Sequence, residues 1–245
     1  MNTRVDYVLP TYKKFTTLHP LLERLKSHFD ESKNVDSRAI FVLDGPDQDS
    51  EDLLMSACDD RIVVTKLPVN TGKGSAIRAA IPLIQSEIVV IIDADLDIDI
   101  KGSVRGIELL LLDSENAIGC VYGSKFHPES SVQYPAIRRA LSWGFRRFSK
   151  TFFNLDVDDT QTGLKVLRSN VFESIGRQCS EERFLFDVEL MTWISRAGLK
   201  LVSTPVTITH QFNSTIKPRV VIEMVRDAVL LAFRLSRPRP QIVMV

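Results

Sequence analysis

The chain contains little cysteine and no long hydrophobic run. Its three cysteines, Cys58, Cys120 and Cys179, lie far apart and form no C-x-x-C pair. This spacing argues against a disulfide framework and indicates reduced thiols in a cytosolic protein. The opening stretch MNTRVDYVLP has no apolar segment of the signal-peptide type, and no apolar run approaches the ~20 residues of a membrane span. We therefore expect a cytoplasmic protein whose membrane contact, if any, is peripheral on the cytosolic face.

An excess of charge of one sign is also missing, since 31 Lys and Arg balance 31 Asp and Glu. A strongly basic nucleic-acid surface is therefore not indicated, and we expect no nucleic-acid partner. Internal repeats, low-complexity tracts and Gly/Ser linkers are absent as well. The 245 residues, 44% of them hydrophobic, are enough for one large domain with a real core. We predict a single domain over 1–245, with a nucleotide-binding half at about 1–122 and an acceptor half at about 123–245.

What the chain does contain is an alternation of apolar strands and helical segments. Short apolar runs bounded by Gly, Pro and Asp predict strands, and apolar residues three and four apart predict helices. Because the strands are continuously apolar, we predict an α/β fold with a mostly parallel sheet and helices on both faces. The predicted strands are 6–12, 38–45, 61–67, 87–93 and 199–209, and the predicted helices are 18–29, 51–58, 72–85, 138–153, 184–198 and 218–235.

Four aspartates follow the apolar run 88–92 directly: Asp93, Asp95, Asp97 and Asp99. Like charges this close repel one another, so we expect a cation among them. Asp93 and Asp95 point to the same side if the strand geometry persists, and Mg²⁺ favours one or two carboxylates together with phosphate oxygens. Ligands of parallel sheets bind at the carboxyl ends of strands, where other predicted strands end in polar residues. A metal–phosphate site is favoured, and a solvated acidic loop is the alternative.

Three known loop motifs do not fit these segments. An EF-hand that starts at the first of these aspartates would need Gly at Ile98 and Glu at Val104. In NTGKGSAIRAAI, a phosphate loop would need Gly at Leu67, and a dinucleotide fingerprint would need Gly at Ile77. Two interpretations remain. The segment is a glycine-rich helix start whose amides, with Lys73, can face a nucleotide, or its glycines only mark the point where a helix begins.

Two polar segments of the second half contain further carboxylates. DDTQTGLK (158–165) predicts a polar turn, and FDVEL places Asp187 and Glu189 at a helix start. Either pair could hold a base or a positioning carboxylate. Acidic residues in a first helical turn also simply stabilise the helix, and this second interpretation is favoured for each residue taken singly.

The order of these segments resembles the family 2 glycosyltransferases with the GT-A fold, and more closely the polyprenyl- or dolichyl-phosphate sugar synthases. The resemblance covers about 8–227, and its specificity comes from the order of many segments rather than from any one of them. The matching stretches are VLPTYKK, FVLDGPDQDSED, NTGKGSAIRAAI, VVIIDADLD, VYGSKF, IRRALSWGF, DTQTGLKVL, FLFDVEL and STPVTI. The family implies a nucleotide-diphosphate-sugar donor, a Mg²⁺ or Mn²⁺ ion and inversion at the sugar carbon. DTQTGLK looks more like the glucosyl members, which favours a UDP-sugar over a GDP-sugar.

The resemblance also implies roles on the donor side. Asp95 would hold the metal on the diphosphate, helped by Asp97 where the family often has Gln, with Asp93 as a third candidate ligand. Asp95 and the basic residue Arg138 would stabilise the charge that develops on the leaving diphosphate. The positions that would line the nucleoside or face the nucleotide are Pro10, Tyr12, Asp44, Lys73 and Asp93.

Other matched positions lie near the phosphates and the acceptor. Asp159 and Gln161 fall where the family places its acceptor-side motif. Asp159 would be the base if the acceptor is a hydroxyl, whereas a lipid phosphate is already anionic and needs little base. The basic positions near the phosphates are Lys125, where the family commonly has Arg, Arg138, with Arg139 as the alternative in a register shifted by one, and Lys217.

The chain departs from the family pattern in two ways. Leu43 occupies a position that is usually acidic, and the membrane helices that dolichyl-phosphate enzymes often carry do not occur before Val245. A lipid acceptor is still supported by two segments, because 138–153 is basic and aromatic and 226–240 joins an apolar patch to arginines. Both suit helices on an anionic membrane surface. The alternatives are amphipathic core helices with solvated basic faces, or, for the segment 226–240, a homodimer interface.

The first hypothesis is therefore an inverting hexosyltransferase acting on polyprenyl or dolichyl phosphate, and a close alternative transfers to a soluble or glycan hydroxyl. A hypothesis of another class is a metal-dependent nucleotidyltransferase, but the stretch VLPTYKKFTTLHP lacks the glycines expected near its first strand. The third hypothesis is a nucleotide-sugar binding module that has lost catalytic activity. The intact series of aspartates argues against such a loss.

Overall fold

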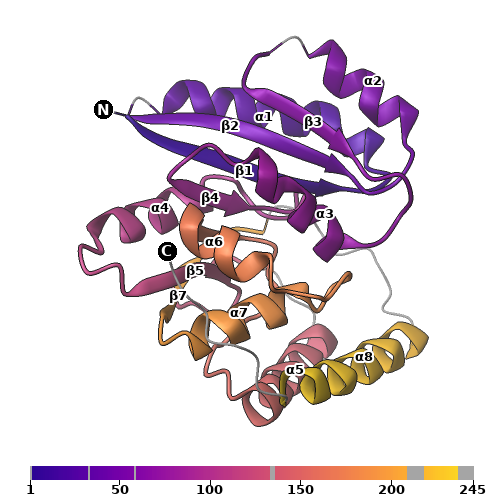
Figure 1. The fold of residues 1–245 in the computed structure, drawn as a ribbon, viewed down its shortest axis with the longest axis vertical. Helices are drawn as coiled ribbons and strands as arrows, with labels where there is room; N and C mark the ends of the chain where they lie inside the picture. Colours follow the sequence, from indigo (N-terminus) through magenta and orange to yellow (C-terminus); the bar gives the residue numbers. More distant parts are fainter. Residues whose placement is uncertain (1, 33, 58, 133–135, 209–217, 237–245) are drawn as a thin grey trace.

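The computed structural model describes residues 2–32, 34–57, 59–132, 136–208 and 218–236, and for 136–143, 145 and 218–225 it describes the backbone only. Strands and helices alternate along most of the chain (Figure 1). The elements are β1 (Thr3–Thr11), α1 (Phe15–Glu31), β2 (Val35–Leu43), α2 (Gln48–Ser56), β3 (Ile62–Lys66), α3 (Lys73–Ala80), η1 (Ile81–Leu83), β4 (Ile88–Ile91), α4 (Gly102–Leu112), β5 (Ile118–Ser124), α5 (Ala136–Phe153), β6 (Lys165–Arg168), α6 (Ser169–Gly176), α7 (Phe186–Arg196), β7 (Lys200–Pro205) and α8 (Pro218–Ser236).

The described strands form one seven-stranded sheet in the order β3-β2-β1-β4-β6-β5-β7. All neighbouring pairs are parallel except those of β6, which runs antiparallel to both β4 and β5. The prediction of an α/β fold with a mostly parallel sheet is therefore confirmed. Four elements have no counterpart among the predicted ones: α4, β5, β6 and α6.

Helices cover both faces of the sheet, as predicted (Figure 1). Alternate strand residues enter different core layers, because side chains of a strand point to opposite faces in turn. In β2, Ile40 and Val42 pack in the layer with α3, α6 and α7, whereas Phe41 packs in the layer with α1, α2 and α4. All four residues of β4 are buried, so the strand that leads to the aspartates is anchored on both sides.

Helix α1 shows how the apolar spacing forms these layers. Leu18, Leu21, Leu22 and Leu25 lie on one face and are buried against the sheet. Each such side chain contributes about 1.5–3 kcal/mol relative to remaining in water. The predicted helix 72–85 is shorter in the structure, since α3 ends at Ala80 and a 3-10 turn follows. Pro82 is the physical reason, because it lacks an N–H and its ring cannot follow a regular helical turn.

The predicted helices 138–153 and 218–235 correspond to α5 and α8. They contact each other and lie together at one end of the molecule, beyond the edge of the sheet that carries β7 (Figure 1). Among the described residues, no helix has the length and apolar character needed to cross a membrane.

Candidate active site

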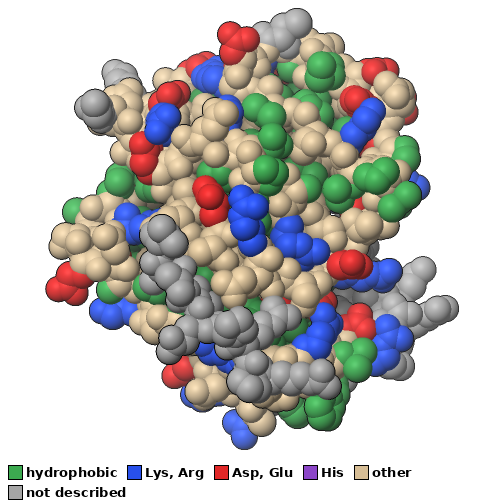
Figure 2. All heavy atoms as spheres, viewed as in Figure 1, with side chains coloured by type: hydrophobic (Ala, Val, Ile, Leu, Met, Phe, Trp, Pro, Cys, Tyr) green, Lys and Arg blue, Asp and Glu red, His purple; other side chains and the backbone are tan. Residues whose placement is uncertain are grey.

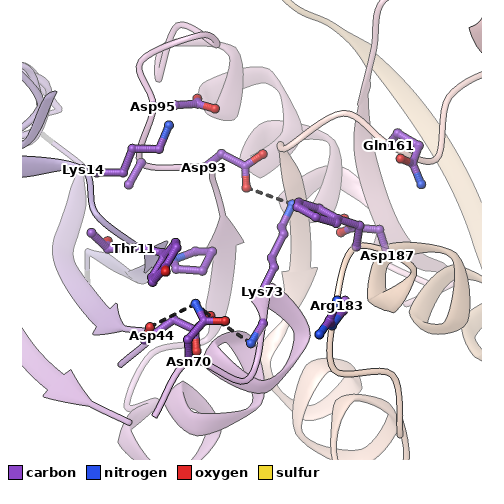
Figure 3. Close-up of a pocket in the computed structure, with 15 residues that line it drawn as sticks. Thr11, Lys14, Asp44, Asn70, Lys73, Asp93, Asp95, Gln161, Arg183 and Asp187 are labelled. Atoms are coloured by element: carbon purple, nitrogen blue, oxygen red, sulfur yellow. Dashed lines mark hydrogen bonds and ion pairs between the residues drawn. The ribbon is translucent and has the colours of Figure 1, made fainter. Parts of the chain in front are cut away.

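A cavity of about 600 Å³ opens at the carboxyl ends of β1, β2 and β4 (Figure 3). Parallel strands present their carboxyl ends at one edge of the sheet, which is why polar residues that are far apart in sequence meet here. Seven of the predicted site residues line the cavity: Pro10, Tyr12, Asp44, Lys73, Asp93, Asp95 and Gln161. The other lining residues are Thr11, Lys14, Asn70, Gly72, Ala94, Arg183, Phe184 and Asp187.

Asp44, at the end of β2, organises one wall of this cavity. Its carboxylate accepts hydrogen bonds from the backbone N–H groups of Thr71 and Gly72, each at 2.8 Å, and from Asn70 Nδ2 at 3.1 Å. Gly72 has a φ of 112°, a conformation that favours glycine. A Cβ atom there would lie 2.5 Å from the carbonyl oxygen of Glu182. The turn before α3 is therefore held between Asp44 and the loop that precedes α7.

A chain of alternating charges runs from the cavity into the interior. Lys73 Nζ lies 2.8 Å from Asp93 Oδ1 and 3.1 Å from Asp187 Oδ2 (Figure 3). Asp187 Oδ1 in turn lies 2.8 Å from Lys165 Nζ. Burial opposes the charge on Lys73, but the carboxylates of Asp187 and Asp93 outweigh it and raise the pKa of the ammonium. Lys73 is therefore a permanent cation beside the cavity.

Asp95 follows β4 on the acidic loop, and its negative charge is less well neutralised by nearby cations than the charges of Asp93 and Asp187. Burial raises the pKa of its carboxyl group, and the negative charges of Asp93 and Asp97 raise it further. Leu96 has a φ of 63°, and this turn lets the Asp97 N–H donate to Asp95 Oδ1 at 3.2 Å. Asp97 itself is not among the residues that line the cavity. A cation at Asp95 would relieve the unfavourable charge.

These carboxylates fit a divalent ion that takes most of its ligands from a substrate. Within the described ranges, no group of three His, Cys, Asp or Glu side chains is arranged to hold a metal ion alone. Asp95 and Asp93 both reach the cavity, and Gly163 leaves room for Asp93, because a Cβ there would lie 2.2 Å from Asp93 Oδ2. Mg²⁺ is commonly bound by one or two carboxylates together with phosphates and water. The donor set agrees with that pattern and not with a closed protein cage.

Asp159 lies apart from these residues, and its carboxylate makes several close polar contacts. Its carboxylate is 2.7 Å from Lys125 Nζ and accepts hydrogen bonds from the Gln161 N–H at 3.0 Å and from the Thr162 hydroxyl. Burial opposes its charge, but Lys125 and Thr162 hold the pKa of Asp159 below its usual range. A carboxylate stabilised in this way is a weak base, so the geometry argues against the predicted role of Asp159 in proton removal. Neither Asp159 nor Lys125 lines the cavity.

The model of glycosyl transferase family 2 matches residues 6–176, which is more than half of the chain. The chain belongs to this family. Among curated relatives, the dolichyl-phosphate beta-glucosyltransferase of Dictyostelium discoideum is 25% identical over 95% of this chain and 75% of its own length. Glycosyltransferase AglD of Haloferax volcanii is 23% identical over 95% of this chain and 36% of its own.

Solved structures confirm the GT-A fold of this glycosyltransferase. Glucosyl-3-phosphoglycerate synthase from Mycobacterium tuberculosis, in complex with uridine diphosphate, superimposes with a TM-score of 0.72 at 15% identity. The alignment covers 97% of this chain and 82% of that one. The same enzyme in complex with Mn²⁺ and UDP-glucose gives a TM-score of 0.68 at 17% identity. At these identities the likeness shows the fold alone.

Three predicted basic positions of the glycosyltransferase cannot be placed at the cavity. Arg138 and Arg139 belong to α5, but their side chains are outside the described part of the structure. Lys217 lies outside the described residues altogether. Their roles near the phosphates therefore remain predictions.

Several cavity residues of the glycosyltransferase were not predicted from its sequence. Lys14 stands within VLPTYKK and Asn70 opens NTGKGS, so the matching segments contained both residues but gave no reason to choose them. Arg183 and Phe184 belong to the loop before α7; Phe184 opens the matching stretch FLFDVEL but was not chosen from it, and Arg183 lies outside every matching stretch. Asp187 was weighed as a positioning carboxylate but set aside in favour of helix stabilisation. The structure places it at the centre of the charge chain.

Proposed function

We propose that this protein is an inverting hexosyltransferase that moves a sugar from a nucleotide diphosphate, UDP in preference to GDP, onto a polyprenyl or dolichyl phosphate. The observation that carries the proposal is the cavity at the strand ends, where Asp95 and the ion pair of Lys73 with Asp93 face the same space. Relatives named dolichyl-phosphate beta-glucosyltransferase, which align over nearly the whole chain, support the acceptor class and the sugar.

The cavity residues can stabilise a departing nucleoside diphosphate. Negative charge develops on the diphosphate as the sugar leaves, and a cation already fixed in a partly buried site stabilises it without reorganisation. Lys73 supplies that cation, and α3 begins beside it with the positive end of its dipole. A Mg²⁺ or Mn²⁺ ion, held by Asp95 and Asp93, would add Lewis-acid stabilisation of the same charge.

A phosphate acceptor agrees with the state of the carboxylates. A phosphate oxygen is anionic near neutral pH and attacks without prior loss of a proton, so no general base is required. Asp159 and Asp187 are poor bases, because Asp159 is bonded to Lys125 and Asp187 is held between two lysines. Direct displacement by the acceptor inverts the configuration at the sugar carbon.

A second acceptor class is favoured by one observation. The structural neighbour from Mycobacterium tuberculosis, a glucosyl-3-phosphoglycerate synthase, is also solved with phosphoglyceric acid bound. A soluble acceptor that offers a hydroxyl beside an anionic group is therefore the alternative.

Membrane association at α5 and α8 forms part of the proposal. Exposed apolar side chains lie on these helices together with basic ones (Figure 2). Among the side chains of α5 and α8 that the structure describes, the exposed apolar ones are Phe152, Leu230 and Phe233, and the exposed basic ones are Arg146, Arg147, Lys150, Arg226 and Arg234. Such a surface can lie on anionic lipid headgroups and bring a lipid phosphate to the enzyme.

The donor part is tested by calorimetric titration with UDP and GDP, each with and without Mn²⁺. We expect Mn²⁺-dependent binding with UDP preferred, and loss of that dependence in Asp95→Asn. Turnover of this variant should fall at least about 100-fold, because a carboxylate that would hold the metal ion is removed. Asp99→Asn, on the same loop but outside the cavity lining, is the matched control. Unchanged turnover in Asp95→Asn would refute the site.

The acceptor part is tested with radiolabelled UDP-glucose and three acceptors: dolichyl phosphate, phosphoglycerate and a glycan with free hydroxyls. We expect label in the lipid phase with dolichyl phosphate only. Label in either of the others, with none in the lipid phase, would replace the proposed acceptor by the hydroxyl class.

A further inference from the structure

The charge chain beside the cavity becomes steadily more buried from Asp93 to Lys165. The relative exposures of the side chains are 31% for Asp93, 13% for Lys73, 3% for Asp187 and 1% for Lys165. A buried charge is unfavourable unless it is closely paired, so the inner pair cannot be explained as a solvated surface bridge. The four residues come from the end of β4, the start of α3, the start of α7 and β6. The inner pair therefore fixes the relative positions of α7 and β6 directly behind the cavity.

Each carboxylate oxygen of Asp187 lies within ion-pair distance of a lysine. Oδ2 faces Lys73 and Oδ1 faces Lys165, at 3.1 Å and 2.8 Å. Lys165 is itself fixed by donating a hydrogen bond to the Thr162 carbonyl oxygen at 2.7 Å. Asp187 also stands in the first turn of α7, where the helix dipole favours a negative charge. This carboxylate is arranged to stay ionised and to hold cations, and not to accept a proton from an acceptor.

The charges along the chain balance. Asp93 and Asp187 carry two negative charges, and Lys73 and Lys165 carry two positive ones. Without Lys165, Lys73 would be shared by two carboxylates and drawn toward the buried one. Without Asp187, two ammonium groups would lie in one buried region with a single carboxylate between Lys73 and solvent. In either case the Lys73 ammonium would lose its fixed place next to Asp93.

We propose that Asp187 is a positioning residue that holds the Lys73 ammonium at the cavity for the donor diphosphate, and that Lys165 acts through Asp187 by balancing its charge. This inference rests on the proposed function, because it concerns how the same cavity takes a nucleotide diphosphate. Lys73 has one permanent partner, Asp187, and one at the cavity, Asp93. Donor phosphates can join or replace Asp93 as the outer partner while the ammonium stays in place.

The test compares Asp187→Asn with Asp6→Asn by calorimetry with UDP and Mn²⁺ and by steady-state kinetics. Asp6 is also buried and bonded to an arginine, with Arg38 Nε at 2.9 Å, but it lies toward the start of β1, away from the cavity. We expect Asp187→Asn to weaken UDP binding and raise the donor KM by about 10- to 100-fold, the range for one charged hydrogen bond. The acceptor KM should not change. Asp6→Asn should lower the unfolding midpoint without altering UDP affinity.

A double-mutant cycle tests the role of Lys165. Lys165→Met alone should weaken UDP binding, but in the Asp187→Asn background it should weaken binding no further, because both act on the same lysine. The double variant leaves no unpaired buried ammonium, so it also keeps the test valid if Asp187→Asn alone fails to fold. Independent, additive losses would overturn the role given to Lys165.

The remaining outcomes separate this inference from the function it rests on. If the wild-type protein binds neither UDP nor GDP, the proposed function fails and the inference fails with it. If the wild type binds UDP and the folded Asp187→Asn variant or the double variant binds it equally well, only the inference is overturned. A fall in kcat with unchanged UDP affinity and unchanged donor KM would also overturn it, because Asp187 would then not act on the binding of the donor diphosphate.

Discussion

A buried histidine on α1 illustrates how a single residue can set a property of the whole chain. Tyr7 Oη lies 2.9 Å from His28 Nε2 and 3.1 Å from Ser103 Oγ, in a polar group enclosed between β1, α1 and α4. Burial lowers the pKa of His28, and the neighbouring charges of Glu31, Lys101 and Asp99 modify this effect less. The neutral form of the ring is therefore the form that the folded protein holds.

This leads to a prediction for stability against pH. Below about pH 6.5 the unfolded chain binds a proton at this histidine that the folded chain binds only at lower pH. The free energy of unfolding should therefore fall as pH falls from about 6.5, by at most about 1.4 kcal/mol per pH unit for this one proton. Urea unfolding of wild type and His28→Gln between pH 7.5 and 5 measures the slope, which should be shallower in the variant. His19→Gln, an exposed change on the same helix, should keep the wild-type slope.

At the same scale, the sequence predicted residues on or beside strand ends better than residues on loops. Asp93 and Asp95 follow a buried strand, so their place at the cavity follows from the geometry of parallel sheets. Arg183 and Asp187 reach the cavity only because the loop before α7 packs on the turn at Gly72. Such a long-range contact leaves no periodic signal in the sequence.

At the scale of elements, the start of α3 depends on that packing. A Cβ at Gly72 would meet the Glu182 carbonyl, and the positive φ is itself unfavourable for other residues. We predict that Gly72→Ala lowers the free energy of unfolding by about 1–3 kcal/mol and weakens UDP binding. Gly144→Ala, in α5, is the matched control, because a Cβ added there would have nothing within 4 Å. That change should raise helix stability by about 0.5–1 kcal/mol. Equal effects of the two changes, measured by urea unfolding, would contradict the packing described here.

The elements that were not predicted from the sequence were missed for a common physical reason. β6 has only four residues, one of them a buried lysine, and its neighbours β4 and β5 both precede it in the sequence. Strand partners that are distant along the chain are not encoded in local periodicity, and a short strand has too few residues for a clear pattern. The long amphipathic helices α1, α5 and α8 were predicted because their spacing is repeated over several turns.

At the scale of the whole molecule, the two proposed halves share one sheet. The boundary placed at 122/123 falls inside β5, and both core layers combine side chains from before and after it. The two halves are therefore parts of one packed body, and the loop before α7, which belongs to the second half, contributes directly to the cavity.

The surface of α5 and α8 gives a prediction for membrane binding. Leu230 and Phe233 are 52% and 70% exposed, so the double change to Ser should weaken sedimentation with phosphatidylserine vesicles by about tenfold or more. Binding should also weaken with added salt, because the basic residues contribute. Leu112→Ser removes an apolar side chain that is 80% exposed on α4 and should leave vesicle binding unchanged. Unaltered sedimentation of the double variant, with a change from dimer to monomer by light scattering, would assign this surface to a second copy instead.

The reversed direction of β6 has a consequence for how such a site can be assembled. Ile91 at the end of β4 is paired with Lys165 at the beginning of β6, so the residues that lead into β6 arrive at the rim where the other central strands terminate. Had β6 followed the common direction, Gln161 and Gly163 would have emerged on the far side of the molecule. One inverted strand thus allows an incoming segment and several outgoing segments to surround the same cavity.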